Sequence, residues 1–357
     1  MRIEARLTDP LDALHERREP GRLRVGLVVP QSGALGLTGP SAVDAALLAA
    51  HELNTAGGVR GRYVDLVLVD GGRAPADVAT ETGRLCEADA VDAVVGFHTS
   101  DVHRAVEAVV AGRTPYVFTP PHEGGRRRVG VVCTGVDPGR QLSGPIAWLA
   151  RHHATRRWAL VGNDYIWPQA VHRQARRAVA AAGGRTVLER RVPLGGVAAG
   201  MERLLDDLRG ARPDALLLSL VGRDLAHFNA GLRQAGLDRG LVRLSGALEE
   251  NGLLAVGGDR TGLLYAAMPS FESLRDERHL GLAARHRDLF GPGAPVLNTY
   301  AEGVYDGIRL VAALADGDGL HPGLLGPAVA RTLGRSGGAS PRVHLARADG
   351  LGFDVVA

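Results

Sequence analysis

The stretch LRVGLVVP (residues 23–30) decides the fold class together with the loop and the apolar segment that follow it. Its near-continuous Val and Leu are typical of a strand that is buried on both faces of a sheet. The loop GALGLTGPS (33–41) comes next, and then AVDAALLAAHELNTAGGV (42–59), which has the composition of a long helix and closes on two glycines. Glycines of this kind end helices. A strand, a loop and a helix in this order predict one repeat of a parallel α/β sheet.

The same order recurs to about residue 269, and it restarts once near the middle of the chain. Apolar runs alternate with helical segments in both halves, so we expect an α/β fold of two doubly wound parallel-sheet lobes joined by a hinge. Lobe 1 is expected at residues 22–143 plus about 272–325, lobe 2 at 144–271 plus about 326–357, and residues 1–22 form an N-terminal extension. The further strands expected are YVDLVLVD (63–70), AVDAVVGF (90–97), TPYVFTPP (114–121), RRWALVGND (156–164), RTVLERRVP (185–193), DALLLSLVG (214–222), LVRLSGA (241–247) and LLYAAMP (263–269).

Length and composition are those of a globular protein with two domains. The chain has 357 residues, 45% of them hydrophobic and 23% charged, and a formal net charge of only +3. It contains no lysine, so all fixed positive side chains are arginines. The absence of lysine excludes a phosphate-binding loop that ends in Gly-Lys-Ser/Thr and excludes Schiff-base chemistry.

The cysteines and the amino terminus bear on the compartment. Cys86 and Cys133 lie in apolar stretches and are expected to be buried free thiols, with no disulfide framework and no metal cluster. Residues 1–22 mix charges throughout and lack the apolar core of a secretory signal, and no run reaches the ~18 apolar residues of a membrane span. We therefore expect a cytoplasmic protein without membrane insertion. The alternative is an exported or lipid-anchored protein whose leader has been removed.

Motifs of enzymes and DNA-binding repressors are missing. The glycines of GALGLTGP follow G-x-x-G-x-x-G rather than the spacing of a dinucleotide-binding turn. There is no H-E-x-x-H or G-x-S-x-G, no evident nucleophile–base pair, and the histidines show no metal-ligand spacing. We therefore expect no catalysis, no cofactor and no metal. About 22 residues before the first strand are too few for a helix-turn-helix module, so direct contact with nucleic acid is not expected.

Ligands of doubly wound sheets bind beyond the carboxyl ends of the strands. One of the loops at these ends is VGNDYIWP (161–168), which holds Tyr165 and Trp167 in a chain with only six tyrosines and three tryptophans. If the two lobes face each other across a cleft, these aromatic residues form one wall of it. The other loops expected there are GALGLTGP, GFHTSDV, FTPPHEGG, LVGRDLA and SGALEEN.

Several stretches occur in the order and spacing of a known family. The sequence resembles type I periplasmic-binding-protein-like receptors over about residues 22–320, and it is most similar to the branch that binds amides and urea. That branch includes urea-transporter binding proteins and the cytoplasmic amide sensor that represses amidase operons. The stretches that carry the resemblance are GLVVPQSG, LNTAGGVRGR, VVGFHTSDVHRAV, FTPPHEG, VGNDYIWP, ARPDALLLSLVG and NTYAEGVYDG.

The resemblance implies a non-catalytic receptor that closes on a small polar ligand (an amide, urea or an amino-acid-like molecule) between its lobes. The expected role is a cytoplasmic ligand sensor with a regulatory protein partner. The alternative is the substrate-binding component of an ABC transporter for urea, short-chain amides or branched-chain amino acids, with a permease as partner. A homodimer is left open.

The resemblance also implies ligand-binding residues on the first lobe and on the aromatic loop. Ser100 falls on the ligand-binding hydroxyl and Tyr165 on a tyrosine, while His98 and Trp167 replace aromatic residues of the amide sensor. Each has another interpretation: Ser100 as a helix N-cap, the two aromatic residues as packing at the hinge, and His98 as a surface histidine like His122. Two imidazoles would suit a ligand with an acceptor or a negative charge. The remaining first-lobe candidates are Thr99, Phe118, Thr119 and His122.

Three further segments complete the expected site. Val221 and Gly222 match a turn whose backbone amides approach the ligand, and an ion pair between Arg223 and Asp224 is the simplest interpretation of the residues that follow. Glu249 either reaches the cleft or begins the next helix, where a carboxylate suits the helix dipole. Tyr300 matches a segment that returns to the first lobe and forms part of the hinge floor.

Overall fold

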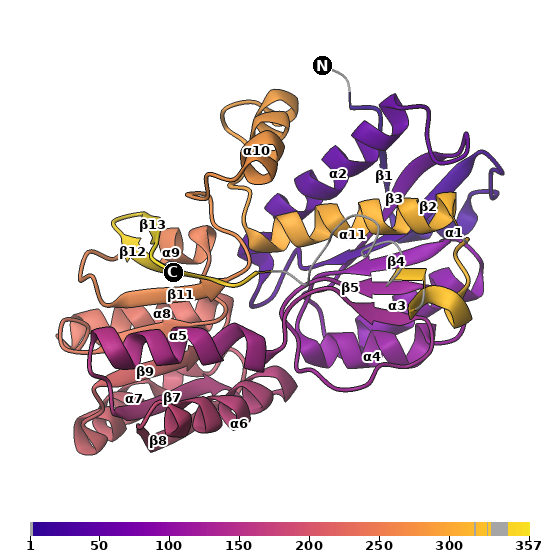
Figure 1. Ribbon diagram of the computed structural model, residues 1–357. Helices are drawn as coiled ribbons and strands as arrows, with labels where there is room; N and C mark the ends of the chain where they lie inside the picture. The colour runs from indigo at the N-terminus through magenta and orange to yellow at the C-terminus, as the bar shows by residue number, and fades with distance from the viewer. Residues whose placement is uncertain (1–2, 318, 327, 330–341) are drawn as a thin grey trace. The chain divides into compact units, whose positions relative to one another are not determined.

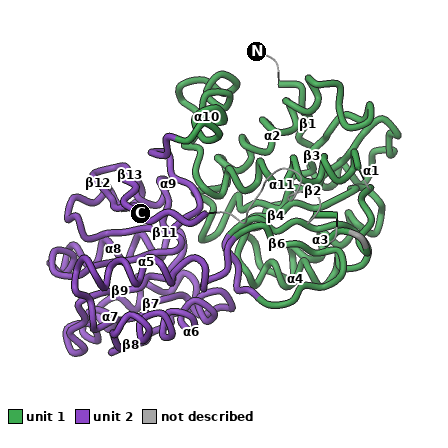
Figure 2. The backbone as a smooth tube through the Cα atoms, viewed as in Figure 1, with its two compact units in different colours: residues 1–120, 125–135, 276–341 green, residues 121–124, 136–275, 342–357 purple. Residues whose placement is uncertain are grey.

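The computed structural model describes residues 3–317, 319–326, 328–329 and 342–357, and the chain divides into two compact units (Figures 1 and 2). Unit 1 consists of residues 1–120, 125–135 and 276–341, and unit 2 consists of residues 121–124, 136–275 and 342–357. Each unit is built on its own mainly parallel sheet with helices packed on it. The expected fold class, two α/β lobes with parallel sheets, is confirmed.

The sheet of unit 1 has six described strands in the order β1-β3-β2-β4-β5-β6, and every neighbouring pair is parallel. The predicted run 23–30 forms β2, and its Val and Leu side chains are fully buried, as a central parallel strand requires. The strands are β1 (Arg6–Thr8), β2 (Arg22–Val29), β3 (Tyr63–Asp70), β4 (Ala93–Gly96), β5 (Tyr116–Phe118) and β6 (Val131–Cys133).

The helices of unit 1 connect these strands or return to them from the far end of the chain. Helix α11 packs against α2 although about 250 residues separate them, as Figure 1 shows. Glu52 of α2 accepts hydrogen bonds from the Tyr305 hydroxyl of α11 at 2.6 Å and from Arg285 of α10 at 2.7 Å. The helices are α1 (Pro10–His15), α2 (Gly39–Thr55), α3 (Pro75–Glu87), α4 (Ser100–Val110), α10 (Glu277–Phe290) and α11 (Thr299–Asp316), with short 3₁₀ turns at Gly36–Thr38 and Pro322–Leu324.

The sheet of unit 2 has seven described strands in the order β13-β12-β11-β10-β9-β7-β8. Strands β7 to β11 pair in parallel, whereas β12 and β13 form an antiparallel hairpin on β11 that the sequence analysis did not expect. The strands are β7 (Arg157–Asn163), β8 (Arg185–Val192), β9 (Ala215–Ser219), β10 (Val242–Ser245), β11 (Leu264–Met268), β12 (His344–Asp349) and β13 (Gly352–Val355).

The helices of unit 2 cover this sheet in the expected alternation with the strands. They are α5 (Pro138–His152), α6 (Ile166–Ala181), α7 (Val197–Ala211), α8 (Gly222–Gln234) and α9 (Glu250–Ala255). In the part of the chain that the structure describes, no helix combines the length and the apolar character that crossing a membrane requires.

Each sheet has one point at which the chain reverses its direction of growth. In unit 1 the chain adds β3 on one side of β2 and then crosses to add β4 on the other side. In unit 2 it adds β8 on one side of β7 and then β9 on the other. Ligand sites of doubly wound sheets lie at the carboxyl ends of such strand pairs. The fold therefore directs attention to the loops after β2 and β4 and to those after β7 and β9.

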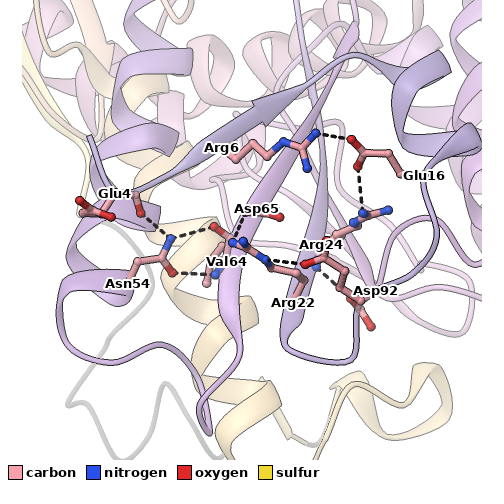
Figure 3. Close-up of polar contacts among 10 residues, drawn as sticks. Glu4, Arg6, Glu16, Arg22, Arg24, Asn54, Val64, Asp65 and Asp92 are labelled. Atoms are coloured by element: carbon pink, nitrogen blue, oxygen red, sulfur yellow. Dashed lines mark hydrogen bonds and ion pairs between the residues drawn. The ribbon is translucent and has the colours of Figure 1, made fainter. Parts of the chain in front are cut away.

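The amino-terminal extension is part of unit 1 rather than a separate appendage (Figure 2), and Figure 3 shows polar contacts that hold it there. Strand β1 pairs with the edge of β3, and the side-chain amide of Asn54 fixes the neighbouring backbone. That amide donates to the carbonyls of Glu4 and Val64 at 2.6 and 3.0 Å, and its oxygen accepts the Val64 N–H at 2.6 Å. Glu16, just after α1, binds both Arg6 and the buried Arg24. A three-residue strand and a six-residue helix are too short for periodicity to reveal.

Candidate ligand-binding site

The loop after β2 is held by a carboxylate at the end of the neighbouring strand. Asp70 accepts hydrogen bonds from the N–H groups of Gln31 (2.8 Å), Ser32 (3.2 Å) and Gly72 (2.8 Å), and from the Ser32 hydroxyl (2.7 Å). Burial works against the charge, but the Ser32 hydroxyl and the backbone donors outweigh it and lower the pKa of Asp70. The loop at the switch point of unit 1 is therefore fixed by an ionised side chain.

Ser100 lies directly after the loop that leaves β4, at the other strand of this switch point. It is the first residue of α4, and the N-cap position belongs to Thr99, whose side chain makes no capping hydrogen bond. The Ser100 side chain is buried, and among the described residues its hydroxyl has no hydrogen-bond partner. The capping alternative is thus not realised, and the hydroxyl remains available, although the Asp101 carboxylate accepts the N–H of Val102 at 3.0 Å in the first turn of α4.

His98 lies at the same strand end but is tied into the interior of unit 1. One ring nitrogen is 3.1 Å from the Thr99 carbonyl, and the other is 3.1 Å from the Tyr116 hydroxyl, which in turn lies 3.0 Å from a ring nitrogen of His103. Burial lowers the pKa of His98 to about 4, so its imidazole is neutral at pH 7. Its polar atoms serve this buried network, and the surface-histidine alternative does not apply.

Phe118, Thr119 and Tyr300 also lie within unit 1. Phe118 belongs to the hydrophobic core, with its ring stacked 4.0 Å from that of His103. The Thr119 hydroxyl donates to the Gly96 carbonyl at 3.2 Å. Tyr300, near the start of α11, stacks on Phe97 with ring centroids 4.5 Å apart. All three thus have packing or hydrogen-bonding roles within the unit.

His122 belongs to the short segment 121–124 that is assigned to unit 2. Its backbone N–H donates to the Val136 carbonyl at 3.0 Å, and its Nδ1 accepts the N–H of Gly124 at 3.0 Å. That acceptor role places the ring proton on Nε2. The side chain is half-buried and stabilises the turn in which it stands.

The switch point of unit 2 is organised by Asp224, in the first turn of α8. Its carboxylate accepts hydrogen bonds from the Asn163 side-chain amide and from the N–H groups of Gly195 (2.7 Å) and Val197 (3.3 Å). The Asn163 oxygen accepts the Val221 N–H at 3.0 Å, so one buried pair joins the loops after β7, β8 and β9. The expected ion pair between Arg223 and Asp224 is wrong: the buried carboxylate is satisfied by amides.

This bonding pattern bears directly on Val221 and Gly222. The N–H of Val221 is already committed to Asn163, and Gly222 begins α8 with a positive φ of 49°, which glycine adopts without strain. Val221 is the N-cap of α8, and its side chain makes no capping hydrogen bond. As on α4, the amino terminus of this helix lacks a side-chain cap.

Tyr165 and Trp167 begin α6 on the other strand of the same switch point. Tyr165 is the N-cap, is half-buried and makes no side-chain capping bond. Trp167 lies in the first helical turn with only 4% of its surface exposed, and its indole N–H has no partner among the described residues. A buried indole N–H usually finds an acceptor, so this donor stands out.

Two glutamates follow β10 and differ in role. Glu249 caps α9 by accepting the N–H groups of Asn251 (2.9 Å) and Gly252 (2.8 Å), as the dipole argument expects. Glu250 is 3% exposed, and one of its oxygens accepts the Glu272 N–H at 2.8 Å while the other has no partner among the described residues. Burial raises the pKa of Glu250 to about 8, with the charge of Glu249 adding to the effect, so the carboxyl is protonated at pH 7.

A nucleophile–base arrangement does exist in unit 2, contrary to the sequence-based expectation. The Ser219 hydroxyl lies 2.9 Å from His172 Nε2, and His172 Nδ1 lies 3.1 Å from a carboxylate oxygen of Glu189. Ser219 and His172 are each 1% exposed. A Cβ added to Gly162 would come within 2.2 Å of the Ser219 oxygen, so there is no room for a substrate beside it. The arrangement is a buried structural network.

Taken unit by unit, the structure brings Ser100, Thr99 and His98 together at one switch point, and Tyr165, Trp167, Val221 and Gly222 together at the other. Sequence reasoning did not find Asp70, which holds the loop after β2, or Asn163 and Asp224, which join the loops after β7, β8 and β9. Both aspartates lie near strand ends or helix starts, but the partners of Asp224 are 27 to 61 residues away in sequence.

We predict that Asp224→Asn destabilises the loops of unit 2. An amide can accept on only one atom, so at least one of the three donors loses its acceptor, at a cost of about 2 kcal/mol. Hydrogen exchange followed by mass spectrometry should show faster exchange at residues 193–197 and 221–225, with a lower urea midpoint. The control is Asp206→Asn, which removes an exposed carboxylate from α7. Equal exchange in both variants would contradict the assigned role.

Glu250 gives a prediction about pH. A glutamate in the unfolded chain loses its proton near pH 4.5, whereas folded Glu250 keeps it to about pH 8. The folded chain therefore binds the extra proton in this interval, and stability contributed by Glu250 is complete below pH 4.5 and is lost as the pH rises to 8. Relative to Glu250→Gln, the free energy of unfolding of the wild type should fall by up to about 5 kcal/mol over that range.

Urea unfolding at pH 5, 6.5 and 8 measures this difference. The matched control is Glu202→Gln, a change of the same kind at an exposed position of α7. Parallel pH profiles for wild type and Glu250→Gln would show that the carboxyl is ionised in the folded protein.

Solved structures with this fold come from several bacteria. LivJ, the branched-chain amino acid transporter substrate-binding protein from Streptococcus pneumoniae, solved with isoleucine, is 17% identical over 94% of this chain and 99% of its own, with a TM-score of 0.78. A solute-binding protein of an ABC transporter from R. palustris, solved with benzoate, is 16% identical over 94% and 96%, with a TM-score of 0.75. An ABC transporter substrate-binding protein from Desulfitobacterium hafniense, in complex with Leu, is 18% identical over 94% and 100%, with a TM-score of 0.73.

At such identities these structures establish the fold, and the family follows from the sequence. The sequence model of the periplasmic binding protein family matches residues 22–334, which is most of the chain. The match does not single out the amide and urea branch. The family match agrees with the two mainly parallel-sheet units of the structure. The network of Ser219, His172 and Glu189 is buried and leaves no room for a substrate. The chain belongs to the periplasmic binding protein family, and it is a non-catalytic solute-binding protein.

Proposed function

We propose that this chain is the solute-binding component of an ABC transporter and that its solute carries a carboxylate group. The observation that carries this proposal is shared by the two units. The helices that follow the switch-point strands, α2 and α4 in unit 1 and α6 and α8 in unit 2, all begin without a side-chain capping hydrogen bond. Their N-cap side chains leave the first N–H groups unused, although Asp101 accepts the Val102 N–H of α4, and such N–H groups favour a negatively charged partner.

The chemistry of α4 suits a carboxylate in particular. Its positive end is joined by the Ser100 hydroxyl, which has no partner among the described residues and can donate a hydrogen bond. The relatives named above were solved with isoleucine, leucine and benzoate, each of which has a carboxylate. Neutral amides and urea form the second ligand class, because they can use the same donors without the benefit of charge.

We further propose that Tyr165 and Trp167 are solute-binding residues of unit 2. Trp167 offers a buried indole N–H that lacks an acceptor, and Tyr165 offers a half-buried ring and hydroxyl on the adjacent loop. Phe118 and Thr119 would then support the site from within the core rather than touch the solute.

Calorimetric titration with isoleucine, leucine, benzoate, acetamide and urea tests the ligand class. We expect a carboxylate to bind, and Ser100→Ala and Tyr165→Phe each to weaken it about 5- to 30-fold, the equivalent of ~1–2 kcal/mol for a lost hydrogen bond. Ser143→Ala, an exposed serine on α5, is the control and should bind normally. The indole fluorescence should change on saturation and lose that change in Trp167→Phe.

Saturable binding of acetamide or urea with no response to the carboxylates would overturn the ligand class and restore the amide and urea expectation. Normal binding by both Ser100→Ala and Tyr165→Phe would move the site elsewhere.

The role in transport has a separate test, because it requires the protein to act outside the cytoplasm. The named relatives are described as transporter components, and none of them is described as a sensor. Fractionation of the native host with an antibody against the chain should recover the protein with the cell envelope or the medium. Recovery with the cytosol would instead favour the sensor function.

A further inference from the structure

A cavity lies wholly within unit 2, at the opposite edge of its sheet from the loops after β7 and β9. It has a volume of about 1110 Å³ and is formed by the connections that precede β10 and β11 and by the turn of the β12–β13 hairpin. These are the amino ends of the parallel strands, where the fold family does not lead one to expect the solute. Its charged lining consists of Arg233, Asp238, Arg239, Asp259 and Arg260, with several glycines and Leu351 completing the wall.

The floor of this cavity is fixed by a buried guanidinium. Arg243 of β10, only 1% exposed, donates from Nη2 to Asp259 at 2.9 Å, to the Thr261 hydroxyl at 2.8 Å and to the Asp238 carbonyl at 3.3 Å. The other carboxylate oxygen of Asp259 accepts the N–H and the hydroxyl of Thr261. Backbone hydrogen bonds of 2.8 Å in both directions join Asp259 to Gly350. Three chain segments are thus held in a fixed relation around the cavity.

The same contacts neutralise one of the two aspartates that line the cavity and occupy several of its carbonyls. Asp259 is neutralised by Arg243, and the Gly258 carbonyl is taken by Arg233. Helices α8 and α9 end beside the cavity, and their negative poles would oppose an anion if nothing offset them. Arginines on the lining supply that offset.

Two arginines of the lining have no protein partner. Arg239, between α8 and β10, and Arg260, between α9 and β11, are exposed, and neither forms a hydrogen bond or ion pair with any described residue. The lining arginines outnumber the lining aspartates by three to two, and one of those aspartates is already paired with Arg243 behind the wall. The cavity is therefore a preformed, net positive recess with two unused guanidinium groups on separate loops.

We propose that this cavity binds a small oxyanion, either free phosphate or the phosphate or carboxylate group of a small metabolite, between Arg239 and Arg260. Guanidinium groups present planar, paired donors that match phosphate and carboxylate oxygens. The cavity is large enough for a molecule of metabolite size. Because the site lies on a fixed floor at the amino edge of the sheet, binding there does not need the loops of the solute site.

The probes are inorganic phosphate, glycerol 3-phosphate and malonate, titrated by calorimetry at constant ionic strength. The double variant Arg239→Gln/Arg260→Gln should weaken binding of the tightest probe at least tenfold. The control Arg173→Gln/Arg177→Gln removes the same charge from exposed positions of α6, outside the cavity, and should bind as the wild type does. Saturation should slow hydrogen exchange at residues 236–240 and 257–261.

The comparison among the three probes separates the sources of the anion. Tightest binding of phosphate indicates the free ion, of glycerol 3-phosphate a phosphate ester, and of malonate a dicarboxylate. If both double variants bind the anion equally more weakly than the wild type, the weakening comes from the lower net charge alone, and the proposal is overturned. So would saturable binding of an acidic peptide with no response to the three small anions, since that result would identify a protein-docking surface.

The result is independent of the solute site. Arg239→Gln/Arg260→Gln should leave binding of the carboxylate solute unchanged, whereas Ser100→Ala should leave phosphate binding unchanged. If one of the two bindings is absent in the wild type, or does not respond to its own variant, that result identifies which proposal has failed.

Discussion

The carboxyl ends of parallel strands lie at one edge of a sheet, and the loops that leave this edge must find partners for their backbone N–H groups. In each unit one aspartate meets much of that requirement: Asp70 in unit 1 and Asp224 in unit 2. Asp224 works through Asn163, so that one short network joins the loops after three strands. Without these acceptors the loops would lose hydrogen bonds that water alone would have to replace. In unit 2 the loops that carry Val221 and Gly222 depend on this arrangement, whereas Asp70 fixes the loop after β2 in unit 1.

At these sheet edges the loops and the helix termini differ in how their N–H groups are satisfied, and this difference bears on ligand binding. The aspartates satisfy the loops, while the helices that follow them, α4, α6 and α8, begin without side-chain caps. Elsewhere in the described chain Asp137, Asp276 and Asn298 cap α5, α10 and α11, whereas α3 and α7 also begin without a side-chain cap. A fixed loop beside an uncapped helix terminus offers preorganised donors, which is what a small anionic solute requires.

Much of the architecture could be predicted from sequence, because long strands that are buried on both faces consist of nearly continuous Val and Leu, as residues 23–30 do. The three-residue β1 and the hairpin of β12 and β13 were not predicted, since short or half-exposed strands carry little pattern. The end of a strand indicated Tyr165 as a candidate, because position after a strand is a local property, whereas Ser100 was proposed from the family resemblance. The pairing of Asp224 with Asn163 spans 61 residues, and only the folded chain shows it.

Burial also decides what a side chain can do, and residue type alone does not. Ser219, His172 and Glu189 have the chemistry and the spacing of a nucleophile, a base and an orienting acid, yet the close approach of Gly162 shuts substrate out. The two ring nitrogens of the neutral His98 are likewise engaged in hydrogen bonds with the Thr99 carbonyl and the Tyr116 hydroxyl. Arg239 and Arg260 are the reverse case: ordinary surface arginines in sequence, they gain a role only because Arg243 and Asp259 hold a recess open between them. In this chain a polar group is a candidate for ligand binding when the surrounding network is satisfied without it.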